Sequence, residues 1–309
     1  MTAETVVRLS GVSPVLEVPF SDDGDLDVES FVRLTHHVLA TGVRSVLFPA
    51  FASEFYKVTE AEREVLSTEL YRAASEGDGV LVIASVPDHA TRVAVARAVR
   101  EAERGAGAIN LLPPHLAGLP RAAVLAHCAE VLAAVEPTPV VIQNAPALTG
   151  GGIDAAALGI LRADHPNLAA VKVESSPPGE LIAALASRAD PIPSLIGYAG
   201  LHLIDAHQRG AVGVQPGCSF VELYVAIWTA LEAGDDERAR TLHARLVPWL
   251  AYWMQSVELI VAAEKEISVR RGLIRTAHCR APGWRLDAVE LRGIDLFCST
   301  FAKELGVRS

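Results

Sequence analysis

The chain has 309 residues, of which 50% are hydrophobic and 21% are charged. This composition is typical of a globular protein with one large domain or two small ones. The formal net charge is −10, which argues against a nucleic-acid partner because phosphate binding needs a basic face. No run of about eighteen apolar residues occurs, so we expect no membrane-spanning segment.

The N-terminal stretch MTAETVVRLSGVSP has neither a long apolar run nor a cleavage-site pattern, so we expect no signal peptide. The four cysteines are far apart and form no C-x-x-C pair. Disulfides and a zinc site are therefore not expected. Together these features predict a protein of the reducing cytoplasm without a metal site.

Short runs typical of β-strands alternate with longer amphipathic stretches. The expected strands span residues 11–20, 43–50, 79–86, 106–114, 138–146, 167–175, 192–199 and 210–217. The helical patterns between them include 27–42, 59–77, 89–107 and 200–211. Eight strand–helix alternations predict an α/β protein with a (β/α)8 TIM barrel in residues 1–233. A doubly wound sheet is the alternative, although no G-x-G-x-x-G follows the first strand.

From residue 234 onward the pattern changes to helices alone. Three helical stretches are expected, at 235–256, 257–273 and 285–306. We therefore predict a C-terminal helical extension, residues 234–309, that packs on the barrel.

In such barrels the active site lies at the C-terminal ends of the strands. Lys172 and Glu174 end the sixth strand and point to the same side, because strand side chains alternate. A lysine inside a barrel is surrounded by low dielectric, which favours the neutral amine that can attack a carbonyl and form a Schiff base. Glu174 could then move protons. The alternative is a purely structural ion pair.

Five motifs follow one another in an order that resembles a known family. They are GVSPVLEVPFSDDGDLD (11–27), FPAFASEFYKVTEAER (48–63), VVIQNAPALTG (140–150), NLAAVKVES (167–175) and GAVGVQPG (210–217). Nearly the whole chain resembles the dihydrodipicolinate synthase / N-acetylneuraminate lyase superfamily of Schiff-base lyases. The closest likeness is to the branch of 2-keto-3-deoxy sugar-acid dehydratases.

The resemblance implies that Lys172 is the Schiff-base lysine. It also implies that the loop holding Ala52 and Ser53 binds the carboxylate of a ketoacid through backbone N–H groups and the Ser53 hydroxyl. The family's relay tyrosine falls at Gln143, which cannot exchange a proton as a phenol does. Its dicarboxylate-binding arginine falls at Leu148, so dihydrodipicolinate synthesis is not expected. Glu174 is the candidate that replaces the tyrosine in proton transfer.

Other candidates lie at strand ends or in the loops that follow them. We expect Gln143 and Gln215 to bind the substrate, and Gly197 and Gly217 to let a ligand approach the backbone. Weaker candidates are Glu54, which we expect to hold its loop by accepting backbone N–H groups, and Tyr56, His115 and Tyr198.

The resemblance implies a lyase that dehydrates a 2-keto-3-deoxy sugar acid, such as 2-keto-3-deoxyarabonate, through a lysine imine and without any cofactor. The first alternative is a pyruvate-dependent class I aldolase that takes a non-dicarboxylate aldehyde, for which Leu148 would offer an apolar contact. A non-catalytic ketoacid-binding relative is the second. The resemblance also implies a homo-oligomer, either a dimer or a tetramer.

Overall fold

Eight short parallel strands are central to the computed structural model, which describes residues 8–76, 79–114, 116 and 118–306. The strands are β1 Gly11–Val12, β2 Ser45–Phe48, β3 Leu81–Val86, β4 Ala108–Leu111, β5 Val140–Asn144, β6 Leu168–Val173, β7 Ser194–Ile196 and β8 Gly213–Val214. Their order in the sheet is β1-β8-β7-β6-β5-β4-β3-β2. Because consecutive strands are neighbours and helices connect them, the fold is a nearly closed (β/α)8 barrel with a C-terminal helical extension, as predicted.

The helices alternate with the strands and then continue alone to the C-terminus. They are α2 Val28–Ala40, α3 Glu60–Glu76, α4 Thr91–Glu103, α5 Arg121–Val135, α6 Pro146–Thr149, α7 Ala155–Asp164, α8 Gly179–Ala186, α9 Leu203–Gln208, α10 Val221–Glu232, α11 Asp236–Trp253, α12 Val257–Arg270, α13 Ala288–Thr300 and α14 Ala302–Leu305. Three short 3₁₀ helices accompany them: η1 Phe51–Ser53, η2 Phe55–Lys57 and η3 Tyr198–Gly200.

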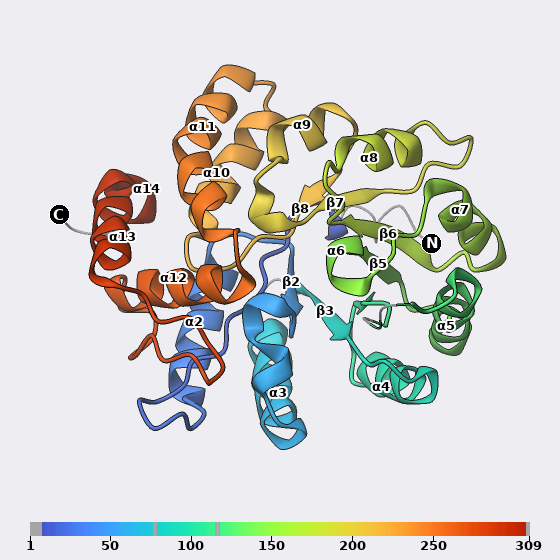
Figure 1. Ribbon diagram of the computed structural model, residues 1–309, viewed down its shortest axis with the longest axis horizontal. Coiled ribbons are helices and arrows are strands. Elements are labelled where there is room, and N and C mark those ends of the chain that lie inside the picture. Colours follow the sequence, from blue (N-terminus) through green and yellow to red (C-terminus); the bar gives the residue numbers. More distant parts are fainter. Residues whose placement is uncertain (1–7, 77–78, 115, 117, 307–309) are drawn as a thin grey trace. The chain divides into compact units, whose positions relative to one another are not determined.

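The chain forms two compact units. The first contains the residues up to Ser13 together with Leu81–Gln215, and the second contains Pro14–Val80 and the residues from Pro216 onward. In the first unit, helices α4, α5, α7 and α8 lie outside strands β3–β7 (Figure 1). The strands between them are buried on both faces, which explains their continuous apolar character.

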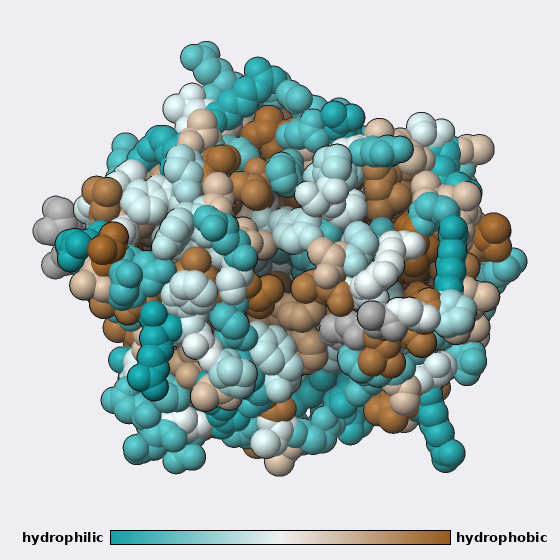
Figure 2. Space-filling view, in the orientation of Figure 1, coloured by the Kyte–Doolittle hydropathy of each residue, from teal (hydrophilic) through white to brown (hydrophobic). Residues whose placement is uncertain are grey.

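In the second unit, helix α12 packs against α11, α13 and η1. An aromatic cluster fills the space near α13, where the Phe297 ring lies 5.1 Å from Trp253 and 5.2 Å from Phe220. On the face shown in Figure 2, hydrophobic residues occur in small groups among hydrophilic ones. Among the described helices, none is both long and apolar enough to cross a membrane.

Two predicted elements differ from the structure at their ends. Strand β1 covers only the first two residues of the predicted 11–20, and Val15 beyond it makes isolated bridges to Leu47 and Gly217. Helix α13 starts at Ala288 rather than at 285, because the Asp287 carboxylate caps the backbone N–H groups of Val289 and Glu290. The boundary at 233 between barrel and extension stays a prediction.

Candidate active site

Strand β6 places Lys172 and Glu174 together inside the first unit. Lys172 is 3% exposed and Glu174 is 9% exposed. The Lys172 Nζ lies 3.5 Å from the Glu174 Oε1. This agrees with the expectation that both side chains share one face, because they are two positions apart on a strand. A buried amine therefore lies beside one carboxylate that can accept or return a proton.

Glu174 is held on its other side by strand β5. Gln143 pairs in register with Lys172, and its Nε2 donates a hydrogen bond of 2.6 Å to Glu174 Oε2. Gln143 is 1% exposed. The carboxylate thus has one oxygen fixed by an amide and the other directed at the lysine.

Two further buried polar residues extend this network, and the sequence analysis did not identify them. Asn110 Nδ2 donates to Gln143 Oε1 at 2.9 Å and to Ser85 Oγ at 3.2 Å. Asn110 pairs in register with Ser85 on β3 and with Val141 on β5. A polar residue at an inward position of an apolar strand is the sequence signal that could have revealed both, because such a group needs a buried partner.

Gly197 and Tyr198 adjoin Glu174 from strand β7. A Cβ atom at Gly197 would overlap the Glu174 side chain, so the missing side chain gives Glu174 its space. Tyr198 and Ala199 both have left-handed backbone conformations, with φ of 48° and 49°. Such strain in residues other than glycine is frequent at functional sites. Burial, and then the Glu174 carboxylate, raise the pKa of the Tyr198 phenol.

Gln215 follows strand β8 and is 2% exposed. Neither its amide nitrogen nor its amide oxygen has a hydrogen-bond partner among the described residues. By alternation it points to the side of Gly213, which pairs in register with Leu195, itself the partner of Lys172. Because buried polar groups are normally hydrogen-bonded, we expect a ligand or a water molecule to bind the Gln215 amide on the side of the sheet where Lys172 lies.

The second unit contains the loop expected to bind a carboxylate. The Ser53 hydroxyl donates to the Leu16 carbonyl at 2.5 Å and accepts from the Ala50 N–H at 3.0 Å. It is fully buried and therefore serves the loop itself. In contrast, no backbone hydrogen bond among the described residues uses the N–H of Ala52, which leaves this group as the candidate donor to an anion.

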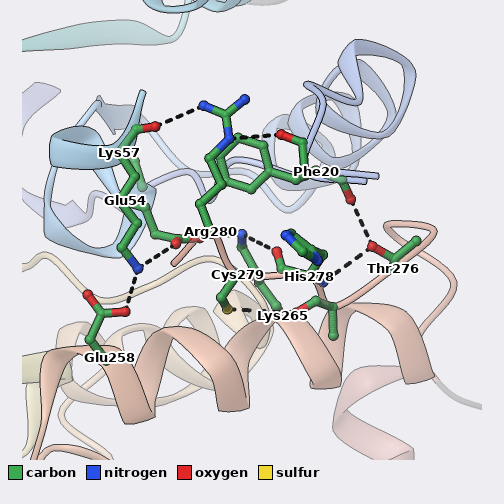
Figure 3. Close-up of polar contacts among 12 residues, drawn as sticks. Phe20, Glu54, Lys57, Glu258, Lys265, Thr276, His278, Cys279 and Arg280 are labelled. Atoms are coloured by element: carbon green, nitrogen blue, oxygen red, sulfur yellow. Dashed lines mark hydrogen bonds and ion pairs between the residues drawn. The ribbon is translucent and has the colours of Figure 1, made fainter. Parts of the chain in front are cut away.

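Glu54 holds the same loop, but not through backbone N–H groups as we expected. Its carboxylate accepts hydrogen bonds from Lys265 and, at 2.9 Å, from Lys57. Both lysines are shown in Figure 3. Tyr56 donates to Glu258 and is 46% exposed, and burial followed by this hydrogen bond raises the pKa of its phenol. The expectation for Glu54 was wrong because its partner Lys265 lies 211 positions away in the sequence, where no local pattern indicates the contact.

Two buried carboxylates, Glu17 and Glu264, lie in the second unit. Burial raises the pKa of Glu17 to about 7, and the Ser268 hydroxyl and Lys265 oppose this rise. Burial, followed by the charge of Glu17, raises the pKa of Glu264. A Cβ atom at Gly217 would overlap the Glu264 carboxyl group. Gly217 therefore accommodates a protein side chain, whereas ligand approach at this glycine stays a prediction.

Two candidates remain, Leu148 and His115. Leu148 belongs to helix α6 and is 36% exposed. His115 lies outside the described residues. The described histidines, cysteines and acidic residues form no group of three or more that could hold a metal ion.

A buried lysine and a buried carboxylate thus lie together at the end of one strand of the (β/α)8 barrel, where enzymes of this fold have their active sites. The Dihydrodipicolinate synthetase family profile matches residues 8–292. The chain belongs to this family and is a lyase, as the sequence predicted.

Individual relatives agree with this assignment. The chain is 30% identical over 245 residues to a 4-hydroxy-tetrahydrodipicolinate synthase of Exiguobacterium sp., covering 77% of this chain and 80% of the relative. It is 29% identical over 258 residues to an L-2-keto-3-deoxyarabonate dehydratase of Azospirillum brasilense, covering 81% of this chain and 80% of the relative. A sialic acid aldolase of Ruminococcus gnavus, solved as a catalytic lysine mutant, shares the fold with a TM-score of 0.86, 21% identity and 98% coverage of both chains.

Proposed function

We propose that this lyase dehydrates a 2-keto-3-deoxy sugar acid, such as 2-keto-3-deoxyarabonate, through an imine on Lys172. The observation that carries the proposal is the 2.6 Å hydrogen bond from Gln143 to Glu174, whose other oxygen lies 3.5 Å from the Lys172 amine. By the resemblance, Gln143 takes the position of a proton-relaying tyrosine. A carboxylate that faces the lysine therefore supplies the acid–base group that the amide cannot supply.

The reaction begins when the neutral Lys172 amine attacks the C2 carbonyl and the resulting carbinolamine loses water to give a protonated imine. Glu174 removes a C3 proton, and the electron pair of that C–H bond forms an enamine. The enamine expels the C4 hydroxyl, which leaves as water after it takes the proton from Glu174. Water then hydrolyses the imine and releases the product and the lysine. The net change is the loss of one water molecule.

The direction of the hydrogen bonds supports the role of Glu174 as the base. Asn110 donates to the Gln143 oxygen, so the Gln143 nitrogen is the end that faces Glu174. Glu174 Oε2 therefore accepts this bond. An ionised carboxylate can remove the C3 proton, whereas a protonated one cannot.

We propose one further substrate contact. The unpaired amide of Gln215 binds a substrate hydroxyl. The buried position of Gln215 and its lack of a partner among the described residues support this role. Ligand contacts at Gly197 and Tyr198 stay predictions, as do assembly as a dimer or tetramer and residence in the cytoplasm.

Aldol cleavage is the second candidate, and Leu148 is the observation that favours it. Its partly exposed apolar side chain replaces the arginine expected for a dicarboxylate substrate, so an aldolase reaction would use an apolar aldehyde. A ketoacid-binding protein without turnover is the third candidate. The buried amine argues against it, because burying an unused lysine is costly.

Borohydride trapping with intact-protein mass spectrometry tests the proposal. Wild type and Lys172→Ala are incubated with pyruvate and with a panel of 2-keto-3-deoxy acids, and Lys303→Ala serves as a control lysine variant. We expect a Lys172-dependent adduct whose mass shows the loss of one water molecule beyond imine formation. A pyruvate adduct from a longer ketoacid would instead indicate aldol cleavage, and the absence of any adduct would overturn the imine.

A further inference from the structure

A cavity of about 560 Å³ lies between the start of helix α7 and helix α8 in the first unit. These two helices contact each other and lie outside strands β5 and β6 (Figure 1). All residues that line the cavity belong to the first unit. Its volume falls in the range of pockets that bind small molecules.

The cavity is separate from the Lys172 network, although both adjoin the same strand ends. Asn144 lines the cavity and follows Gln143 on β5, so the two side chains point to opposite sides of the strand. The Asn144 amide is held by Ile153, because it donates to the Ile153 carbonyl at 3.1 Å and accepts from its N–H at 3.0 Å. Asn144 therefore contributes a fixed wall to the cavity.

Ser175 supplies an unpartnered hydroxyl to the same cavity. Its oxygen is buried and has no hydrogen-bond partner among the described residues, although Ser175 lines the cavity. Buried polar atoms are normally hydrogen-bonded, and a hydroxyl can both donate and accept. The Ser175 hydroxyl is thus free to bind an uncharged polar group of a ligand.

The charged residues that line the cavity are both acidic. Asp154 and Glu180 are these residues, and no described lysine, arginine or histidine lines it. Asp154 already caps α7 through the Ala157 N–H at 2.9 Å and pairs with Arg121 at 2.6 Å. The Glu180 carboxylate is exposed and has no ion-pair partner among the described residues. It attracts a cationic group and repels an anionic one.

The rest of the lining is mainly apolar. Pro146 and Ile153 come from the segment between β5 and α7, whereas Leu181 and Ala184 come from α8. An apolar wall of this kind favours a ligand with a hydrocarbon or aromatic body, because burying that body removes apolar surface from water.

We propose that this cavity is a second ligand site, which binds a small amino alcohol with an apolar body. The protonated amine pairs with the Glu180 carboxylate, and the ligand hydroxyl exchanges a hydrogen bond with Ser175. The apolar body lies against Ile153 and the α8 side chains. Lys172 takes no part, so occupancy of this site does not depend on imine chemistry.

The experiment measures the Kd of three matched probes by ligand-observed saturation-transfer NMR. Phenylglycinol carries both polar groups, α-methylbenzylamine lacks the hydroxyl, and phenethyl alcohol lacks the amine. Glu180→Gln and Ser175→Ala each remove one anchoring group, and Ala184→Trp fills the cavity. Glu103→Gln, which removes an exposed carboxylate elsewhere in the first unit, is the matched control.

We expect phenylglycinol to bind more tightly than either comparison probe. Glu180→Gln should weaken it about two- to fivefold, as for an exposed ion pair, and leave phenethyl alcohol unchanged. Ser175→Ala should weaken it about two- to tenfold, as for one hydrogen bond, and leave α-methylbenzylamine unchanged. Ala184→Trp should abolish binding of all three probes, whereas Glu103→Gln and Lys172→Ala should not change it.

The absence of phenylglycinol binding to folded wild type would overturn the inference, as would binding that is unchanged in both Glu180→Gln and Ser175→Ala. These two surface variants decide the matter if Ala184→Trp lowers Tm. Binding that is lost in Lys172→Ala would mean that the probe occupies the catalytic site. Self-association of the wild type that Ala184→Trp abolishes would instead identify this face as an interface between copies. Failure of imine trapping would overturn the proposed function and leave this site standing.

Discussion

Gln143 donates a 2.6 Å hydrogen bond to Glu174, and the oxygen of Gln143 accepts one of 2.9 Å from Asn110. These two hydrogen bonds both run toward the Glu174 carboxylate. Their direction makes Glu174 an acceptor and leaves its second oxygen beside the Lys172 amine, 3.5 Å away. Four predictions follow from this arrangement and from the buried glutamates of the second unit.

Replacement of Glu174 by glutamine should separate proton transfer from imine formation. Turnover of the best substrate in the trapping panel should fall roughly 100- to 10,000-fold, the usual contribution of a general acid–base group. Pyruvate should still be trapped on Lys172, because the amine is retained. Steady-state kinetics and intact mass measure the two effects, and unchanged turnover would exclude Glu174 as the proton-transfer group.

Asn110→Asp tests whether the direction of the hydrogen bonds matters. Ionised aspartate has no donor for the Gln143 oxygen, so the Gln143 amide should reverse and turn its oxygen toward Glu174. We expect kcat to fall about tenfold or more, with trapping of pyruvate retained. Asn110→Leu is the comparison, since it removes the bond without reversing it. Equal kcat values in the two variants would contradict this interpretation.

Gly197→Ala should disturb Glu174. The added Cβ at Gly197 would overlap the Glu174 side chain. We expect a loss of kcat together with a shift of only a few degrees in Tm. Gly151→Ala is the matched control, because nothing lies within 4 Å of a Cβ atom there. A Gly197→Ala variant with wild-type kcat would show that Glu174 has room to move.

Glu17→Gln should alter how stability depends on pH. The pKa of Glu17 rises from 4.5 to about 7 on folding, so the folded protein keeps a proton that the unfolded chain loses. Above pH 4.5 the free energy of unfolding of the wild type therefore falls as the pH rises, until about pH 7. The difference of about 2.5 pKa values corresponds to roughly 3 kcal/mol.

Relative to wild type, Glu17→Gln should thus gain about 3 kcal/mol between pH 4 and pH 8. Chemical denaturation at several pH values measures this gain, and Glu232→Gln at an exposed position is the control. A constant difference between the Glu17 variant and wild type would mean that folding leaves the pKa of Glu17 unchanged.

Much of the fold could be predicted because local patterns repeat along the chain. Apolar strands that alternate with amphipathic helices require a parallel sheet covered by helices, and all eight strands fall inside the predicted ranges. The ends of elements were less accurate, since the start of α13 depends on the Asp287 cap. Strand alternation alone also placed Lys172 and Glu174 on one face.

The partners of these residues depended on tertiary structure. Asn110 and Gln143 come from different strands, and only the register of β4 and β5 brings their amides together. Lys265 reaches Glu54 across 211 positions of sequence. No local pattern encodes such contacts, because a buried polar group is satisfied by whatever the packed chain places beside it. The sequence by itself determined the strands and the position of Lys172 on one of them. The tertiary structure decided which polar groups surround Lys172 and Glu174, because those groups come from other strands.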